Sequence, residues 1–204
     1  GCIPTNLPGY AGYGAGDLDR FQRAWGRRPP AEPGLVVTEM VEGCLDGRVR
    51  AMYVVGENPL LSEPDLHHAE KALQQLDFLV VQDLFMHETA ERAHVFLPAA
   101  AFAEKDGTFT NSERRVQRIR QAIDPPGQAR PDWWIACELA KRTARRLGRR
   151  VTGFDYQHPS EIFDEMASLW PSVRGMTYAR LEGGGLQWPC PGPEHPGTRY
   201  LYGE

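Results

Sequence analysis

Short apolar runs alternate with longer amphipathic stretches through the middle of the chain. Three runs, at residues 49–55, 78–81 and 95–97, are apolar and too short for helices, so each is predicted to be a buried strand. Strands that alternate with helical segments are typical of a parallel sheet with right-handed crossovers. The pattern therefore predicts an α/β fold, with an open, mostly parallel twisted sheet and helices on both of its faces.

Helix signals lie on either side of these runs. Ser62 is expected to open the helix that follows the first strand, because Asp65 comes three residues later, as in a capping box. Asp132 is expected to cap a helix that runs from Trp133 to about Leu147 and ends at Gly148. Shorter helices are expected at Leu18 to Trp25, at Leu35 to Leu45 and from Ser160 onward.

The ends of the chain and one internal stretch are less regular. Residues 1–34 are rich in Gly, Pro and Tyr and are expected to be irregular, and in residues 102–130 the apolar positions are too sparse to decide between helix and strand. The tail from Gly183 to Pro196 is expected to be a covering strap rather than a core element. We therefore predict an α/β domain at residues 1–150, from which residues 103–131 form an excursion, and an accessory helix with a covering tail at residues 151–204.

Composition narrows the possible partners. The formal charge of -4 on 204 residues argues against binding of nucleic acid by bulk electrostatics. No apolar run approaches the roughly 20 residues of a membrane-spanning helix. The first residues show no signal peptide, and the sequence reads as the inside of a longer protein.

The four cysteines lie far apart, with no Cys-x-x-Cys pair and no histidine at zinc-finger spacing. Neither a zinc site nor an iron-sulfur cluster is predicted within the chain, so no residue is assigned to a metal. Free thiols in a reducing compartment are the favoured interpretation, and two disulfides in an exported protein are the alternative. The four residues are Cys2, Cys44, Cys137 and Cys190.

The segment after the first predicted strand has the features of a ligand site. Ligands gather at the carboxyl ends of parallel strands, Gly56 lets the backbone approach a ligand closely, and Asn58 offers an amide. The free backbone amides at the start of the helix expected at Ser62 favour an anion such as a pyrophosphate. An ordinary strand-to-helix turn is the alternative interpretation.

The second predicted strand delivers Gln82 and Asp83 to the same edge of the sheet. A carboxylate at this position accepts hydrogen bonds from a ribose or from the ring nitrogens of a guanine. It can equally cap the next helix. Together with the Gly56 turn, Asp83 favours nucleotide binding.

The run from Glu104 to Arg118 is the third candidate, because it is dense in hydrogen-bonding groups. Its arginines, Arg114, Arg115 and Arg118, can pair with phosphates or with acidic neighbours, and a solvated loop is the alternative. The six histidines make no catalytic set, and the chain has no nucleophile elbow and no phosphate-binding Gly-Lys-Ser/Thr loop. We therefore assign no catalytic residue.

Taken together, these segments resemble the catalytic (alpha) subunit of molybdenum-dependent formate dehydrogenases, within the molybdopterin oxidoreductase superfamily. The resemblance covers nearly the whole chain, and its longest run is specific to the superfamily. It rests on Pro8-Gly9-Tyr10, Ala24-Trp25-Gly26, Gly56-Glu57-Asn58-Pro59, Val81-Gln82-Asp83, Glu88-Thr89-Ala90, Leu97-Pro98-Ala99, Glu104 to Asn111, Glu113 to Gln117, Asp132-Trp133 and Gln187-Trp188-Pro189-Cys190. One position departs from the pattern, since His94 stands where the family usually has an aspartate before the Val-x-Leu-Pro strand.

The resemblance implies an internal fragment that covers one molybdopterin guanine dinucleotide-binding domain of the formate dehydrogenase/DMSO reductase type. The full-length protein is then expected to hold molybdenum or tungsten in a bis-molybdopterin guanine dinucleotide, and a 4Fe-4S cluster that this segment does not ligate. The excursion at residues 103–131 is expected to reach toward the iron-sulfur lobe. Carried over by motif, the residues that contact one guanine dinucleotide are Gly56, Glu57, Asn58, Ser62, Gln82, Asp83 and Leu84.

The resemblance also implies an activity, in which the parent enzyme oxidises formate to carbon dioxide and passes the electrons to iron-sulfur clusters. The reacting residues would lie outside this chain, so the isolated fragment is expected to be inactive. The expected partners are the rest of the catalytic subunit and electron-transfer subunits, in the cytoplasm, with no nucleic acid and no membrane span. The alternatives are an assimilatory nitrate reductase or another molybdopterin oxidoreductase, or a cofactor-free scaffold as in the large iron-sulfur subunit of NADH dehydrogenase.

Overall fold

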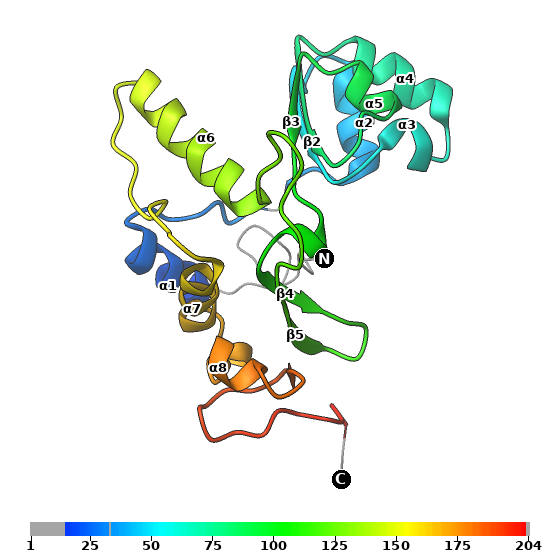
Figure 1. Ribbon diagram of the computed structural model, residues 1–204. Helices are drawn as coiled ribbons and strands as arrows, with labels where there is room; N and C mark the ends of the chain where they lie inside the picture. Colours follow the sequence, from blue (N-terminus) through cyan, green and yellow to red (C-terminus); the bar gives the residue numbers. More distant parts are fainter. Residues whose placement is uncertain (1–14, 33, 203–204) are drawn as a thin grey trace. The chain divides into compact units, whose positions relative to one another are not determined.

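A computed structural model describes residues 15–32 and 34–202, which fall into two compact units (Figure 1). The parallel unit comprises residues 34–101 and 125–135, and the antiparallel unit comprises residues 15–32, 102–124 and 136–202. Residue 150, the domain boundary expected from the sequence, lies inside the antiparallel unit. Cys2, the motif Pro8-Gly9-Tyr10 and residues 1–14 and 33 of the irregular segment expected at the start lie outside the described residues.

The parallel unit is built on a three-stranded sheet. Its strands are β1 (Ala51–Val55), β2 (Phe78–Asp83) and β3 (Val95–Pro98), in the spatial order β1-β2-β3 and all parallel. The three strands predicted from the apolar runs are confirmed, as is their parallel pairing. In the register, Val55 pairs with Gln82 and Asp83 pairs with Pro98, so the carboxyl ends of all three strands meet at one edge.

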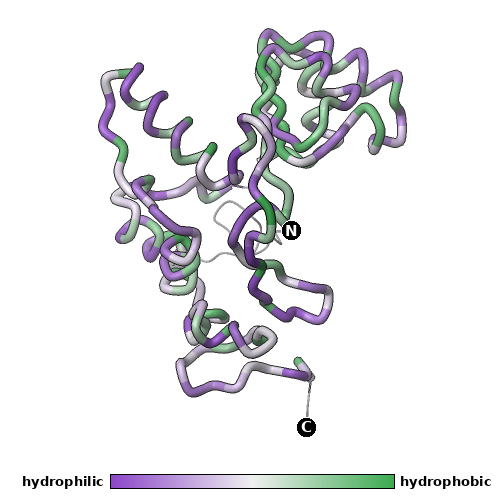
Figure 2. Tube along the Cα trace, in the orientation of Figure 1, coloured by the Kyte–Doolittle hydropathy of each residue, from purple (hydrophilic) through white to green (hydrophobic). Residues whose placement is uncertain are grey.

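Helices α2 (Val37–Leu45), α3 (Pro59–Ser62), α4 (Leu66–Gln74) and α5 (Glu88–Glu91) lie on one side of this sheet (Figure 1). The strands contribute Val54, Leu79 and Val81 to the core that the helices cover, and this apolar stretch stands out along β2 in Figure 2. On the opposite face, Tyr53 and Phe78 are half exposed. The α/β class with a parallel sheet is confirmed, and on this second face Gln82 bonds Asp132 in the first turn of the next long helix.

The helix expected to open at Ser62 begins elsewhere, so that prediction is wrong. Ser62 is the last residue of α3, and the cap of α4 is Asp65, whose carboxylate accepts a hydrogen bond from the His68 amide at 3.0 Å. Pro64 is the physical reason, because a proline has no N–H and pushes the residue before it into extended backbone. Glu63 has that conformation, with φ -71 and ψ 140.

Helix α6 (Asp132–Arg146) starts in the parallel unit and continues in the antiparallel unit. Asp132 is its first residue rather than its cap, and the Asp132 carboxylate accepts a hydrogen bond from Gln82 at 2.7 Å. The predicted end is confirmed, because Gly148 adopts a left-handed conformation with φ +62 and its amide bonds the Arg145 carbonyl at 3.1 Å.

The antiparallel unit contains a second sheet of three strands, β4 (Gly107–Thr110), β5 (Arg115–Ile119) and β6 (Leu186–Gln187), paired in that order. The stretch left undecided between helix and strand is therefore a β-hairpin. Helices α1 (Ala15–Trp25), α7 (Pro159–Leu169) and α8 (Tyr178–Leu181) and the short 3-10 turns η2 (Phe102–Glu104) and η3 (Pro171–Val173) complete the unit. Its core is formed by Val116, Phe163, Ala167, Val173, Met176, Leu181 and Cys190.

The tail is a core element between residues 186 and 190, and the expectation of a mere covering strap is wrong there. Gln187 pairs with Arg115 in the sheet, and Cys190 is fully buried. The glycines before β6 permit this contact: a Cβ on Gly185, which has φ +82, would lie 2.3 Å from the Val116 carbonyl oxygen. Glycine in this segment thus allows close packing rather than looseness.

Three of the four cysteines are described, and all three are free and buried. Burial raises the pKa of the Cys44 and Cys137 thiols, which keeps both in the protonated, unreactive form. The free-thiol interpretation is confirmed for these residues and for Cys190.

Candidate functional site

The turn after β1 lies at the carboxyl edge of the parallel sheet. The Gly56 amide donates a hydrogen bond to the Gln82 carbonyl oxygen at 2.9 Å, so this turn is fastened to the end of β2. Gly56 has φ +64, a conformation that side chains rarely adopt, and a Cβ placed on it would meet no atom within 4 Å. The space above the turn is open, and a ligand can approach its backbone closely.

Glu57 and Ser62 bracket the short helix that follows this turn. The Ser62 hydroxyl donates to Oε1 of Glu57 at 2.7 Å, and the Asn58 amide N–H contacts the same oxygen at 3.2 Å. Oε1 of Glu57 thus holds the turn together, and the Glu57 side chain is also exposed to solvent. Ser62 thus holds a carboxylate in place rather than opening a helix.

Asn58 is fixed at both ends of its amide. Its Nδ2 donates to Oε2 of Glu88 at 2.8 Å, and its Oδ1 accepts from the hydroxyl of Thr89 at 2.6 Å. Thr89 is fully buried, and its hydroxyl also accepts from the Leu60 amide at 3.1 Å. The hydrogen bond from Asn58 lowers the pKa of the Glu88 carboxyl. These contacts fasten the turn after β1 to the start of α5.

Gln82 is buried, with 2% of its surface exposed, and its side chain serves the fold. The Tyr53 hydroxyl donates to Oε1 of Gln82, and the Gln82 amide donates to Oδ1 of Asp132 at 2.7 Å. Burial raises the pKa of the Tyr53 phenol, and the charge of Asp132 raises it further. The structure brings Gln82 to the predicted edge, but both ends of its amide are already engaged.

Asp83 is the carboxylate at the end of β2. Its Oδ1 accepts from the Leu84 amide at 2.6 Å, and its Oδ2 lies 3.4 Å from Nε2 of His87. His87 caps α5, because its Nδ1 accepts from the Ala90 amide at 3.3 Å. Since Nδ1 is an acceptor, the neutral ring carries its proton on Nε2, facing Asp83. The sequence also allowed Asp83 to cap the next helix, but in the structure His87 caps α5.

His87 Nε2 is one of two buried side-chain atoms without a hydrogen-bond partner among the described residues. Its separation of 3.4 Å from Asp83 is longer than a normal hydrogen bond, although it is within ion-pair distance. His87 therefore restricts the orientation of the Asp83 carboxylate. The carboxylate, in turn, does not fully satisfy the hydrogen-bonding capacity of His87 Nε2.

An apolar rim follows Asp83 directly. Leu84, Phe85 and Met86 are 44%, 73% and 56% exposed. Three consecutive exposed apolar side chains beside a carboxylate present a surface for the flat face of a base or for another protein segment. Of the predicted site residues, Leu84 is the one that contributes this apolar surface.

The side chains at this edge can accept hydrogen bonds from neutral donors. Glu57, Asp83 and Glu88 supply carboxylates, which accept hydrogen bonds from ring nitrogens, amino groups and hydroxyls. The start of the helix at which the sequence favoured an anion such as a pyrophosphate is capped by the Asp65 carboxylate, whose negative charge would repel an anion. The edge therefore presents acceptors for neutral hydrogen-bond donors.

Sequence reasoning missed Thr89, His87 and Tyr53 as parts of this site. Thr89 belongs to a word that carries the family resemblance, Glu88-Thr89-Ala90, so a signal for it existed. Tyr53 could not be found from local sequence, because its partner Gln82 lies on another strand, whereas Asp83 and Ala90, the partners of His87, lie within four residues of it.

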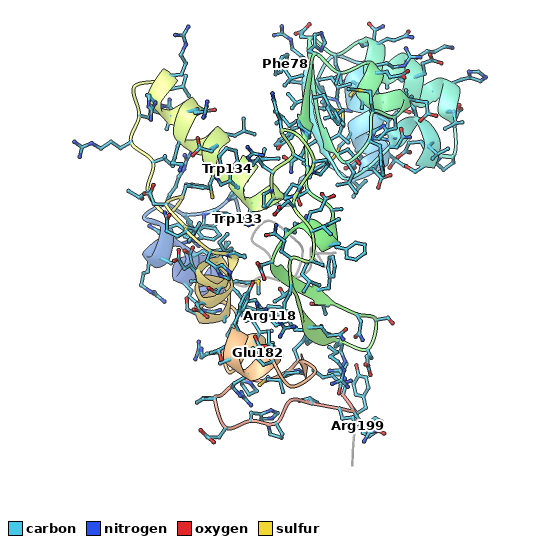
Figure 3. The ribbon with its side chains drawn as sticks, in the orientation of Figure 1. Phe78, Arg118, Trp133, Trp134, Glu182 and Arg199 are labelled. Carbon is cyan, nitrogen blue, oxygen red and sulfur yellow. The ribbon has the colours of Figure 1, made fainter. Side chains whose placement is uncertain are left out.

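The third candidate segment lies in the antiparallel unit, and its arginines are used inside that unit. Arg118 bonds Glu182 at 2.8 Å and lies over the ring of Tyr178, and Figure 3 shows Arg118 and Glu182 together. Arg114 bonds the carbonyls of Trp188 and Thr198, the second at 3.0 Å. Arg118 therefore takes the pairing with an acidic residue that the sequence allowed, whereas Arg114 bonds backbone carbonyls instead.

Two further properties of residues 15–32 and 34–202 concern metals and membranes. No group of three or more His, Cys, Asp or Glu side chains there is arranged to hold a metal ion. None of the helices described combines the length and the apolar character needed to cross a membrane.

Comparison with known proteins identifies the family. A sequence model described as Molybdopterin oxidoreductase matches residues 7–142. The chain is also 47% identical, over all of its length, to the F420-dependent formate dehydrogenase 2 subunit alpha of Methanococcus maripaludis. The chain belongs to the molybdopterin oxidoreductase family. This confirms the resemblance drawn from the sequence words, and the cofactor given by the family's name is molybdopterin.

The relatives that this chain matches are longer than the chain itself. It is 45% identical to the F420-dependent formate dehydrogenase subunit alpha of Methanocaldococcus jannaschii, and it spans 29% of that protein and of the Methanococcus relative. Among solved structures, acetylene hydratase from Pelobacter acetylenicus has a TM-score of 0.58 over 84% of this chain and 23% of its own, at 18% identity. That likeness shows the shared fold.

Proposed function

We propose that this chain is the cofactor-holding part of the catalytic subunit of a molybdenum-dependent formate dehydrogenase. The observation that carries the proposal is the edge of the parallel sheet, where an open left-handed turn at Gly56 lies beside the exposed carboxylate of Glu57 and the partly buried carboxylate of Asp83 at the end of β2. The names of its relatives give the reaction. When bound, the cofactor supplies the redox centre that takes two electrons from formate as carbon dioxide and a proton form.

In this proposal the edge holds the guanosine end of one molybdopterin guanine dinucleotide. Glu57 and Asp83 accept hydrogen bonds from the guanine ring nitrogen, its amino group or the ribose hydroxyls. Gly56 lets the ligand approach the backbone, Leu84 supplies apolar contact, and Asn58 holds the turn. Ser62 and Gln82 act through the fold, since Ser62 orients Glu57 and Gln82 joins β1 to α6.

The rest of the machinery is proposed to come from outside this chain. The full-length protein would hold molybdenum or tungsten between two such dinucleotides and a 4Fe-4S cluster that takes the electrons onward. Its partners would be electron-transfer subunits, since its relatives are named as alpha subunits, and its location would be the cytoplasm. The antiparallel unit would face the cluster lobe. The isolated chain would bind part of the cofactor at most and would oxidise no formate.

The test uses the full-length parent protein, with molybdenum, tungsten, guanine nucleotide and formate-dependent dye reduction measured on one preparation. We expect metal, guanine nucleotide and formate oxidation together. Nitrate-dependent oxidation of the dye without formate activity would favour a nitrate reductase, and absence of both metal and nucleotide would favour a cofactor-free scaffold. Dye reduction by the isolated chain would contradict the division of labour proposed here.

A matched pair of variants localises the site on β2. Asp83→Asn changes the carboxylate at the carboxyl end of the strand, and Asp77→Asn changes one just before its start, where Asp77 pairs with Arg50 at 2.6 Å. We expect Asp83→Asn to lower the guanine nucleotide content of the purified protein about tenfold, because hydrogen bonds to a charged acceptor are the strong ones. Asp77→Asn should leave the content unchanged.

A further inference from the structure

The candidate edge has carboxylates for the base and sugar but needs a cation for the diphosphate of a dinucleotide. Glu57, Asp83 and Glu88 all carry negative charge there, and the Asp65 cap closes the start of α4 to an anion. A diphosphate bound beside these groups would be repelled unless a positive charge compensates them. The cation must be contributed by another segment that reaches the same edge.

Arg130 is on such a segment. Its amide donates to the Pro98 carbonyl at 3.2 Å and its carbonyl accepts from the Ala100 amide at 2.9 Å, so residue 130 pairs with Ala99 as a parallel extension of the sheet. Ala99 in turn donates to the Asp83 carbonyl at 3.0 Å. Since neighbouring strands lie about 4.8 Å apart, the Arg130 backbone is about 10 Å from that of Asp83 along the edge.

The charge of Arg130 is uncompensated, in contrast to the other arginines of the parallel unit. Arg48 pairs with Asp46, Arg50 with Asp77 and Arg92 with Glu70. Among the ion pairs of the described residues, none includes Arg130. An exposed arginine held by two backbone hydrogen bonds at a ligand edge, with no carboxylate partner, has its charge available to an anion.

The guanidinium of Arg130 also has donors to spare. It lies 6.0 Å from the ring centroid of Trp134, which Figure 3 labels at the start of α6, and one Nη donates to the Ala129 carbonyl at 2.7 Å. A guanidinium has five N–H groups in a planar fork that matches two phosphate oxygens. The carboxylate nearest in sequence, Asp132, is bonded to Gln82, which anchors the Arg130 segment to the end of β2.

We infer that Arg130 binds the diphosphate of the guanine dinucleotide whose guanosine end lies at Glu57 and Asp83. The inference rests on the proposed function, since it concerns the other half of the same ligand. It divides the edge by charge. The carboxylates of Glu57, in the turn after β1, and of Asp83, at the end of β2, take the neutral donors of the nucleoside, and a guanidinium at the far side of β3 takes the negative phosphates.

The test uses cofactor-free full-length parent protein and titrates it with guanosine and with GDP by calorimetry. We expect Arg130→Gln to weaken GDP binding about tenfold or more, because a charge-assisted pair to phosphate is lost, and to leave guanosine binding within about twofold. Arg130→Lys, which keeps the charge but loses the fork, should fall between Arg130→Gln and the unchanged protein. Arg92→Gln is the matched control, an exposed arginine of the same unit that already pairs with Glu70, and should bind both ligands normally.

Three outcomes would overturn the inference, and they are distinguishable from one another. If Arg130→Gln binds GDP as tightly as the unchanged protein while Asp83→Asn loses guanosine, the inference fails and the proposed function stands. If Arg130→Gln weakens guanosine as much as GDP, the arginine acts on the fold and not on the diphosphate. If the unchanged protein binds neither ligand, the proposed edge and the role of Arg130 fall together.

Discussion

The two units of this chain use their polar side chains in opposite ways. In the antiparallel unit, Arg114 and Arg180 donate to backbone carbonyls and Arg118 pairs with Glu182, so the cations hold loops together. In the parallel unit, Glu57 and Arg130 remain exposed at one edge of the sheet. A dense run of polar residues is therefore a weak sign of a ligand site. Exposure at the carboxyl ends of parallel strands is the stronger one.

The largest expected effect is a loss of local stability that is confined to the antiparallel unit. A Cβ on Gly175 would lie 2.0 Å from the carbonyl oxygen of Gly192, which is backbone and cannot move aside cheaply. Gly175→Ala should lower the free energy of local opening of α8 and β6 by about 3 kcal/mol. Hydrogen exchange of the peptides that cover these elements, in the full-length protein, measures the change.

Gly183→Ala is the matched control, because a Cβ on Gly183 would meet nothing within 4 Å and Gly183 has no left-handed φ. Its exchange should match that of the unchanged protein. Peptides of β1, β2 and β3 should exchange normally in both variants. Faster exchange of those strands in Gly175→Ala would show that the two units do not open independently.

The next effect lies in the parallel unit. Gln82→Leu keeps the volume of the side chain but removes the hydrogen bonds to Tyr53 and Asp132, and leaves the Asp132 carboxylate without that donor. We expect the local opening free energy of β2 to fall by about 2 kcal/mol. Gln74→Leu, at an exposed position of α4, is the control and should change exchange little. Equal effects from both variants would mean that the buried amide is dispensable.

A smaller effect should follow the loss of one hydroxyl. Thr89→Val removes the donor to Asn58 and the acceptor for the Leu60 amide while keeping the shape of the side chain. We expect the free energy of local opening of residues 57–62 to fall by about 1 kcal/mol, which speeds their hydrogen exchange. Guanosine binding should also weaken. Thr89→Ser, which keeps the hydroxyl, should retain most of both properties. Normal exchange in Thr89→Val would show that the turn is held by Glu88 and Asn58 alone.

The strands and the edge could be predicted from the sequence because their signals are local. Apolar runs of strand length gave β1, β2 and β3, and the residues directly after them, such as Gly56 and Asp83, are the strand ends. The short sequence motifs that carry the family resemblance include the same positions. A residue's place along a parallel strand is thus readable without knowing its neighbours in space.

The partners of those residues could not be predicted, because they depend on pairing across the fold. Gln82 lies between Tyr53 and Asp132, which are 29 and 50 residues away, and no local pattern announces that contact. The glycines of the tail were ambiguous for the same reason. Gly185 is compatible with a loose strap or with close packing, and only the position of Val116 decides between them.

The smallest expected effect is a titration that separates burial from charge at the Tyr53 phenol. Burial is the larger cause of its raised pKa and Asp132 the smaller, so the neutral phenol is favoured in the folded state. This preference for the neutral phenol stabilises the folded state fully below the unfolded pKa of about 10, and the stabilisation is lost as pH rises through the higher folded pKa. The phenolate absorbance of the protein minus that of Tyr53→Phe should therefore have its midpoint above about 10. Asp132→Asn should lower this midpoint only slightly, because the burial remains. A midpoint that returned fully to the ordinary value in Asp132→Asn would make charge the dominant cause.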